Sequence, residues 1–198
     1  MIEHKIDMYR YWEELERVKA KQNMPCKTLF YGSSTFAIRK TIEEQFSAYK
    51  AINAGFGGST SDEALFHYDN IAKPFAPDTV VWYFGDNEPV CNYTVDETKE
   101  LFTATWERFL ADKPNTRIIT IATKTSPARN EYAGFVKELN AWQKDMAAKC
   151  GYLTYIETAD ICKKDGEYIL ENYLPDQLHF GPKGYEILFK KVKEALDK

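Results

Sequence analysis

Apolar and polar positions alternate along the chain in a pattern that predicts strands and helices in regular succession. Five short apolar runs have the length and the aromatic or β-branched content of buried strands, at residues 28–31, 51–53, 79–84, 118–121 and 153–156. Between these runs, apolar residues recur every three or four positions, as they do in amphipathic helices. The alternation predicts an α/β fold whose mainly parallel sheet has helices on both faces.

Short signals locate several of the predicted helices. The first helix, within residues 9–21, has an apolar stripe of Tyr9, Trp12, Leu15 and Val18. A second helix, after the first strand, is expected on Phe36, Ile38, Ile42 and Phe46. Thr60 with Glu63, and Thr94 with Glu97, have the spacing of capping boxes and predict two helix starts. Pro182 lies just inside the predicted start of the last helix.

The first strand ends abruptly in a glycine followed by three hydroxyl residues, Gly32-Ser33-Ser34-Thr35. Gly32 permits a sharp turn that presents a following side chain at the carboxyl edge of the sheet. Ser34 is therefore a candidate nucleophile. Ser33 is the alternative, and a helix N-cap is the competing structural interpretation of either serine. A serine nucleophile needs a base and donors for an oxyanion.

Two further polar turns follow the second and third predicted strands. One is the glycine-rich loop at residues 53–60, and the other is Gly85-Asp86-Asn87. In parallel sheets, ligands bind beyond the carboxyl ends of the strands, so these turns and Ser34 are expected at one edge. A glycine-rich loop is more often only a turn, and Asp86 could instead be a base or a metal ligand.

The catalytic base would have to be one of three histidines. His4 lies in an unpatterned N-terminal segment, and His67 lies inside a predicted helix, where packing or solvent exposure is the expected role. His179 follows Asp176 by three residues, just before the last helix. Asp176 could accept the Nδ1–H of His179 and leave Nε2 free to take a hydroxyl proton. Taken alone, this pair favours the simpler interpretation that Asp176 and His179 only cap a loop.

Composition narrows the possible functions. The formal net charge of -4 comes from interspersed acids and bases, so nucleic acid is not an expected partner. No apolar run approaches the roughly 20 residues of a membrane span. The four cysteines, including Cys91 near the third strand, lack metal-type spacing and are expected to be reduced and structural. The first residues lack a signal peptide's apolar core, which predicts a cytoplasmic protein unless a leader was removed.

These blocks, taken together, resemble the SGNH hydrolases, also called the GDSL esterase/lipase group. Gly32-Ser33-Ser34 is similar to the nucleophile block, with Ser33 where many members carry Asp, and the loop at residues 53–60, Asn87 and the Asp176/His179 pair are similar to the other blocks. The Gly-Ser-Ser start and the segment at residues 126–129 look most like a bacterial branch. Glu88 departs from the Asp that often follows the block's asparagine.

The resemblance implies a flavodoxin-like, three-layer α/β/α fold with a central, mainly five-stranded parallel sheet and no cofactor or metal. In a single domain spanning residues 1–198, residues 1–26 would be a helical cover. Ser34 would be the nucleophile, His179 the general base and Asp176 the residue that orients it. The oxyanion donors would be the N–H groups of Ser34 and Gly58 and the Asn87 amide, with Gly57 as the alternative to Gly58.

The expected activity is a serine esterase acting on short acyl esters, above all acetyl esters, of a small molecule, with a carbohydrate as the candidate. Arg129 and Tyr93 are candidate substrate contacts, although a surface ion pair is the favoured role for Arg129. Tyr93, Tyr132 and Tyr173 could stack on a sugar, but exposed tyrosines are also ordinary. An acyltransferase would use the same residues. A non-catalytic ligand-binding domain, or a flavin- or phosphate-binding module on the same architecture, remains the competing class. The sequence does not indicate an oligomeric state.

Overall fold

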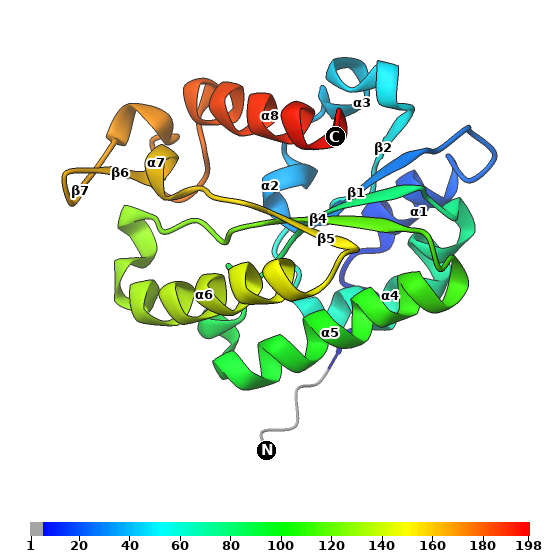
Figure 1. The fold of residues 1–198 in the computed structure, drawn as a ribbon, viewed down its shortest axis with the longest axis horizontal. Coiled ribbons are helices and arrows are strands. Elements are labelled where there is room, and N and C mark those ends of the chain that lie inside the picture. The colour runs from blue at the N-terminus through cyan, green and yellow to red at the C-terminus, as the bar shows by residue number, and fades with distance from the viewer. Residues whose placement is uncertain (1–5) are drawn as a thin grey trace.

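The computed structural model describes residues 6–198, which form a five-stranded parallel sheet in the order β2-β1-β3-β4-β5 (Figure 1). The strands are β1 (Thr28–Gly32), β2 (Ala51–Asn53), β3 (Thr79–Tyr83), β4 (Arg117–Ile121) and β5 (Leu153–Ile156). Thr28 lies opposite Ala51 on one side and Thr79 on the other, and every neighbouring pair is parallel. This order, with helices on both faces, confirms the predicted flavodoxin-like architecture.

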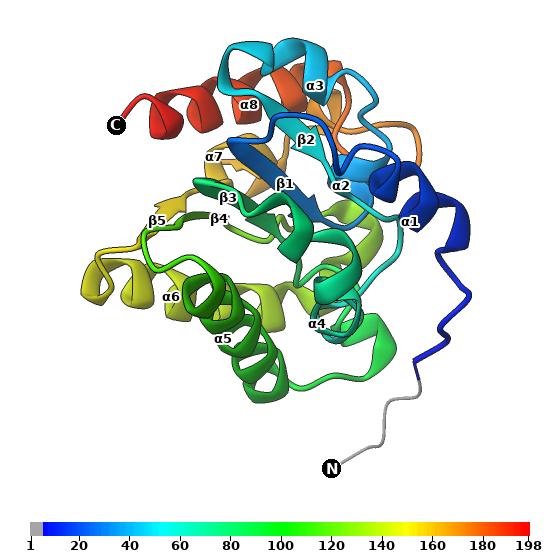
Figure 2. The same ribbon diagram turned by 90° about the vertical axis from the view of Figure 1, so that its right-hand side faces the viewer.

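One face of the sheet is covered by α1 (Trp12–Lys19), α4 (Ser61–Ile71), α5 (Val95–Asp112) and α6 (Ala133–Lys149) (Figures 1 and 2). Val80 and Trp82 of β3 point into this layer. There Trp106 of α5 stacks on Trp142 of α6, with 5.5 Å between the ring centroids. The capping boxes predicted at the starts of α4 and α5 are present. No helix within residues 6–198 combines the length and the apolar character needed to cross a bilayer.

The opposite face is covered by α2 (Ser34–Ala37), α3 (Ile42–Gln45), α7 (Ala159–Cys162) and α8 (Pro182–Leu196). Val81 and Tyr83 point into this second core, so successive residues of β3 serve opposite faces. A strand buried on both faces needs apolar residues throughout, and this explains why the strand segments read as continuous apolar runs.

Two predicted helices differ from the structure. Leu15 and Val18 of the predicted apolar stripe are buried, but Tyr9 and Trp12 are exposed, at 72% and 56%. Tyr11, the residue before α1, is buried in their place. The Tyr11 hydroxyl donates to Glu63 at 2.7 Å, which turns this side of the segment inward.

The single helix expected on residues 36–46 is two short helices, and Ile38 between them is exposed. The break has a tertiary cause. The side-chain amide of Asn53 donates to the carbonyls of Phe36 and Arg39, at 2.9 and 3.3 Å, and so satisfies groups that a continuous helix would use.

A two-stranded antiparallel hairpin was not predicted. It pairs β6 (Lys163–Lys164) with β7 (Glu167–Tyr168) after α7. Asp165 and Gly166 both have positive φ, of 52° and 89°, which matches the Asp-Gly signal of a two-residue hairpin turn. The strands are too short for an apolar alternation to be visible in the sequence.

Candidate active site

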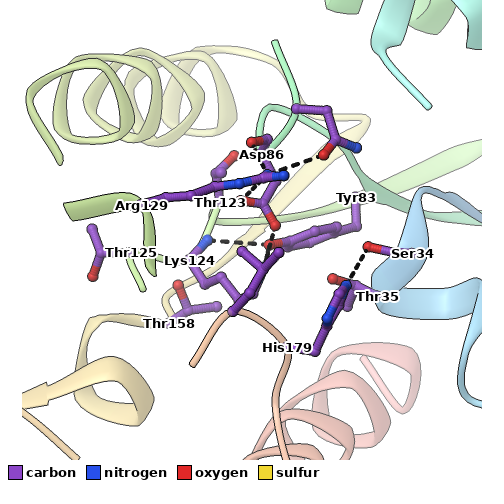
Figure 3. Close-up of polar contacts among 12 residues, drawn as sticks. Ser34, Thr35, Tyr83, Asp86, Thr123, Lys124, Thr125, Arg129, Thr158 and His179 are labelled. Carbon is purple, nitrogen blue, oxygen red and sulfur yellow. Dashed lines mark hydrogen bonds and ion pairs between the residues drawn. The ribbon is translucent and has the colours of Figure 1, made fainter. Parts of the chain in front are cut away.

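Ser34, His179 and Asp176 form a hydrogen-bonded chain at the carboxyl edge of the sheet. His179 Nε2 lies 2.9 Å from Ser34 Oγ, and His179 Nδ1 lies 2.7 Å from Asp176 Oδ2. Figure 3 shows the Ser34 and His179 side chains pointing toward one another. Ser34 begins α2 directly after β1, whereas Asp176 and His179 lie in the loop that precedes α8. The structure thus brings together three residues that the sequence places far apart.

Asp176 holds the loop as well as the imidazole. Its Oδ1 accepts the backbone N–H groups of Leu178 and His179, at 2.9 and 3.0 Å. Partial burial raises the pKa of Asp176, but hydrogen bonds from the His179 ring and from these N–H groups outweigh it and lower the pKa to about 2. An ionised Asp176 favours the tautomer with hydrogen on Nδ1, which leaves Nε2 able to accept the Ser34 proton.

Of the other two histidines, only His67 lies within the described residues, and it is packed in the interior. His67 is buried at 2% exposure among the rings of Tyr11, Phe56 and Phe66, and burial lowers the pKa of its imidazole. His67 is therefore packed, which was one of the two roles expected for it. His4 lies outside the described residues.

Only one of the two adjacent serines is available to solvent. Ser34 is partly exposed, whereas Ser33 is fully buried and its hydroxyl has no hydrogen-bond partner within residues 6–198. The turn needs Gly32, because a Cβ there would lie 2.7 Å from the Phe36 ring and from the Tyr83 carbonyl oxygen. This close packing of β1, β3 and α2 directs the Ser34 side chain to the edge.

The Asn87 amide is held by two hydrogen bonds. Its Nδ2 donates to the Ser59 carbonyl at 2.8 Å, and its Oδ1 accepts from Arg129 Nη1 at 3.0 Å. A side-chain amide has two N–H donors, so one remains for a ligand. Gly58 precedes Ser59 and has φ of +78°, a conformation that favours glycine. Within residues 6–198, neither the Ser34 N–H nor the Gly58 N–H donates a hydrogen bond.

The loop that contains Gly58 lies against the start of α2. Phe56 N–H donates to the Gly32 carbonyl at 3.0 Å, and a Cβ on Gly55 would lie 2.6 Å from Ala37 N. These contacts bring the glycine-rich loop and the nucleophile turn to the same edge, as the topology predicts. They do not distinguish Gly58 from Gly57 as a donor.

A buried charge cluster lies behind the Asn87 turn. Asp86 is 6% exposed and pairs with Lys124, which is 1% exposed and also contacts the Tyr83 hydroxyl at 3.3 Å. Arg129 Nη1 lies 3.3 Å from Asp86 Oδ1 and also donates to the Asp86 backbone carbonyl. Burial lowers the pKa of Lys124, but Asp86 more than offsets this, and the pKa lies above its ordinary value. Asp86 is thus neutralised by two cations.

Sequence reasoning missed Lys124. A signal was present, because Lys124 follows β4 and Asp86 follows β3, and these strands are neighbours. Adjacent strand ends bring the residues that follow them close together. Opposite charges at such positions are therefore a candidate ion pair.

Glu88 connects the Asn87 turn to α4. It is fully buried, and its carboxylate accepts the N–H of Ser61 at 2.8 Å and the N–H of Asn87 at 3.1 Å. Burial raises the pKa of Glu88 to about 7, although the hydrogen bonds work in the opposite direction. The glutamate, which departs from the SGNH pattern, therefore holds the turn through backbone groups.

The candidate substrate contacts differ in how exposed their side chains are and in what they contact. Arg129 is directed at Asp86 and Asn87, with 21% of its side chain exposed. Tyr93 and Tyr173 are buried, at 8% and 7% exposure, so they present little ring surface for stacking on a sugar. Tyr93 lines a cavity of about 110 Å³ that also includes Cys91, whose thiol pKa is raised by burial.

Comparisons with known proteins bear on the fold and on the family of this chain. Solved structures similar to this chain include an inferred acylhydrolase from Bacteroides fragilis (18% identity, TM-score 0.83, 98% of each chain covered). A GDSL-like lipase from Bacteroides thetaiotaomicron is 17% identical with a TM-score of 0.76, covering 96% of this chain and 98% of the other. The catalytic domain of a Streptococcus pneumoniae peptidoglycan O-acetyltransferase is 21% identical with a TM-score of 0.63, covering 88% and 94%.

At these low identities, the structural similarity shows a shared fold only. The family is shown by a match to a family sequence profile. No curated protein matches the chain significantly. The profile of the GDSL-like Lipase/Acylhydrolase family matches residues 30–187, a span from β1 into α8 that includes both the serine turn and the histidine loop. The chain belongs to the GDSL-like lipase/acylhydrolase family, also called the SGNH family.

Proposed function

We propose that the protein is a serine esterase that hydrolyses short acyl esters, with acetyl esters preferred, through an acyl-enzyme on Ser34. The observation that carries this proposal is the Ser34–His179–Asp176 chain of hydrogen bonds, at 2.9 and 2.7 Å, beside the Asn87 amide. A hydroxyl, a base and a carboxylate in this order form the arrangement that activates serine for attack on an acyl carbon.

The first half of the reaction acylates the enzyme. His179 Nε2 takes the Ser34 proton as Oγ bonds to the carbonyl carbon, and Asp176 stabilises the imidazolium that forms. The tetrahedral oxyanion is received by the N–H groups of Ser34 and Gly58 and by the free N–H of Asn87. His179 then protonates the departing alcohol as the bond to the acyl carbon breaks.

The second half releases the acid. A water molecule loses a proton to His179 and attacks the acyl carbon of the ester on Ser34. The second tetrahedral intermediate uses the same donors, and His179 returns the proton to Ser34 Oγ as the acid leaves. Each proton moves between His179 and an oxygen, so the described residues supply all the proton transfers that hydrolysis needs.

Two observations bear on the substrate. The sequence contains no apolar lid segment of the kind that favours long acyl chains. A structural relative acts on peptidoglycan, a carbohydrate polymer, and transfers acetyl groups. We therefore propose acetylated carbohydrates as the first substrates to examine. The Gly32-Ser33-Ser34 turn also supports a place for this chain in the Gly-Ser-Ser branch of the family.

The second candidate function is acyl transfer, and the same relative is the observation that favours it. The first half-reaction would be unchanged, and a substrate hydroxyl would replace water in the second. The two functions differ in the product. Hydrolysis releases free acetate, whereas transfer forms a new ester on the acceptor and releases less acetate when acceptor is added.

The test compares wild type with Ser34→Ala and Ser33→Ala. A fluorophosphonate probe is expected to label wild type and Ser33→Ala but not Ser34→Ala. Turnover of p-nitrophenyl acetate, longer p-nitrophenyl esters and acetylated sugars is expected to follow the same pattern, with rates falling as the acyl chain lengthens. A folded wild-type protein that neither reacts with the probe nor turns over any of these esters would refute the catalytic proposal and leave a binding domain.

A further inference from the structure

We propose that Arg129 is a positioning residue for the reaction, because its guanidinium fixes the Asn87 side-chain amide in the one orientation that can donate to the oxyanion. The inference rests on the proposed function and assigns Arg129 a role beyond the two considered from the sequence, a substrate contact and an ion pair. The contact between Arg129 Nη1 and Asn87 Oδ1, at 3.0 Å, is its starting point.

An asparagine amide has nearly the same shape when its oxygen and nitrogen are exchanged, so its neighbours must select one orientation. Arg129 has only donors and therefore requires the amide oxygen. The Ser59 carbonyl, 2.8 Å from Nδ2, is only an acceptor and therefore requires the nitrogen. Rotation of the amide by 180° would set donor against donor and acceptor against acceptor. The two contacts together leave the second N–H of Nδ2 for a ligand.

Arg129 is itself held in place by Asp86. Its Nη1 donates to the Asp86 backbone carbonyl and lies 3.3 Å from the Asp86 carboxylate. Lys124 pairs with that carboxylate from the other side (Figure 3). Because Lys124 and Asp86 are almost completely buried, their positions have little freedom, and Arg129 is anchored to a rigid pair. The same pairing means that Asp86 keeps a counter-charge when Arg129 is replaced.

The segment that carries Arg129 also contacts the histidine loop. Ala128 N–H donates to the Gln177 carbonyl at 3.2 Å, and the Tyr173 hydroxyl donates to the Thr125 carbonyl at 2.7 Å. Gln177 lies between Asp176 and His179. The segment at residues 125–129 therefore contacts both the Asn87 amide and the loop that carries His179. It positions the oxyanion donor and the base relative to one another.

The test is a double-mutant cycle with Asn87→Ala, using Arg129→Met to remove the guanidinium and Arg129→Lys to keep the charge without the planar donor fork. Arg129→Met is expected to lower kcat about tenfold to a hundredfold while KM changes by less than about threefold. Arg129→Lys is expected to recover only part of the loss. In the Asn87→Ala background, Arg129→Met is expected to have little further effect, because the group that Arg129 orients is gone.

Arg117→Met is the matched control. Arg117 is also a partly buried arginine that donates to a backbone carbonyl, that of Ala195 at 3.0 Å, but it begins β4 at the opposite edge of the sheet. Its replacement is expected to leave kcat unchanged. Added guanidinium ion is expected to restore turnover to Arg129→Ala but not to Arg129→Ala combined with Asn87→Ala.

Two kinetic outcomes would overturn the proposal. Equal losses from Arg129→Met in the presence and absence of Asn87 would show that Arg129 acts independently of the amide. A raised KM with unchanged kcat would instead show a substrate contact. A readout that needs no turnover is the NMR signal of the Asn87 side-chain amide protons, which is expected to shift and to exchange faster in Arg129→Met. An unchanged signal would also contradict the inference, even if the protein proved not to be an esterase.

Discussion

Ser33 and Ser34 are chemically identical neighbours with opposite surroundings. Ser33 lies in the core with no hydrogen-bond partner for its hydroxyl among the described residues, and Ser34 lies 2.9 Å from His179. The sequence pattern indicates a reactive serine after the first strand but leaves both candidates open, because the pattern cannot show which side chain the turn directs outward. The packing of Gly32 against Phe36 and Tyr83 makes that selection.

Asn87→Ala is expected to reduce kcat by about 10²–10³, because it removes one of the donors that receive the oxyanion. Folding is expected to be retained, since the backbone of the turn is held separately by Glu88 and Arg129. Steady-state hydrolysis of p-nitrophenyl acetate measures the loss, and circular dichroism checks the fold. Wild-type turnover in a folded Asn87→Ala variant would exclude Asn87 from the site.

Asp176→Asn is expected to lower kcat by up to about 10⁴. An asparagine Oδ1 can still accept the N–H groups of Leu178 and His179, so the loop geometry is expected to survive. Its Nδ2 would face His179 Nδ1 and favour the tautomer with hydrogen on Nε2, which cannot take the Ser34 proton. Pre-steady-state acylation by a p-nitrophenyl ester reports this step. A full-rate acylation burst would show that Asp176 is dispensable.

Glu88 shows how a single buried carboxylate joins two elements, since it accepts N–H groups from the start of α4 and from the turn after β3. Burial raises the pKa of Glu88 to about 7, so in the folded protein the neutral form is favoured. Because the pKa of Glu88 is higher in the folded than in the unfolded protein, protonated Glu88 stabilises the fold. This stabilisation is complete at pH values below the ordinary pKa of a glutamate and is lost as the pH rises through about 7.

The free energy of unfolding is therefore expected to fall between about pH 5 and pH 8, by up to roughly 3 kcal/mol from this group. Glu88→Gln is expected to be less stable at low pH but to lack this part of the pH dependence, because glutamine does not titrate. Urea denaturation of both proteins across this range measures the difference. Parallel curves for wild type and Glu88→Gln would show that Glu88 does not titrate in this window.

The helices themselves were largely predictable where their signals are local. The capping boxes at Thr60 and Thr94, and the proline at the start of α8, depend on residues within one turn of each other and are confirmed. The break between α2 and α3 was not predictable, because it depends on an amide from Asn53 in a strand that follows both helices.

The sheet and its two helical layers bring residues that are far apart in the sequence to one edge. Ser34 follows the first strand and His179 precedes the last helix, yet the parallel arrangement makes them neighbours. The segment before β1 belongs to the same packing, since Leu15 and Val18 lie in the core with Ile52 and Tyr68. These contacts favour one cooperative unit over a core with a detachable cover, and the single domain remains a prediction.

Leu15→Ala tests this cooperativity. Deleting a buried leucine side chain is expected to lower the free energy of unfolding by about 2–4 kcal/mol. Unfolding in urea, followed by tryptophan fluorescence and by far-ultraviolet circular dichroism, is expected to show one coincident transition at a lower midpoint. A separate early transition, or a midpoint equal to that of wild type, would show that residues 1–26 fold apart from the rest.

Local patterns along the chain specify the alternation of strands and helices, the parallel sheet, and the polar turns at its carboxyl edge. These follow from the spacing of apolar residues and from turn residues, which act over a few positions. The tertiary structure alone decided which serine faces His179, how the Asn87 amide is oriented, and that Lys124 and Arg129 neutralise Asp86. Such pairings join residues that are distant in the chain, and their geometry exists only once the strands are aligned and water is excluded.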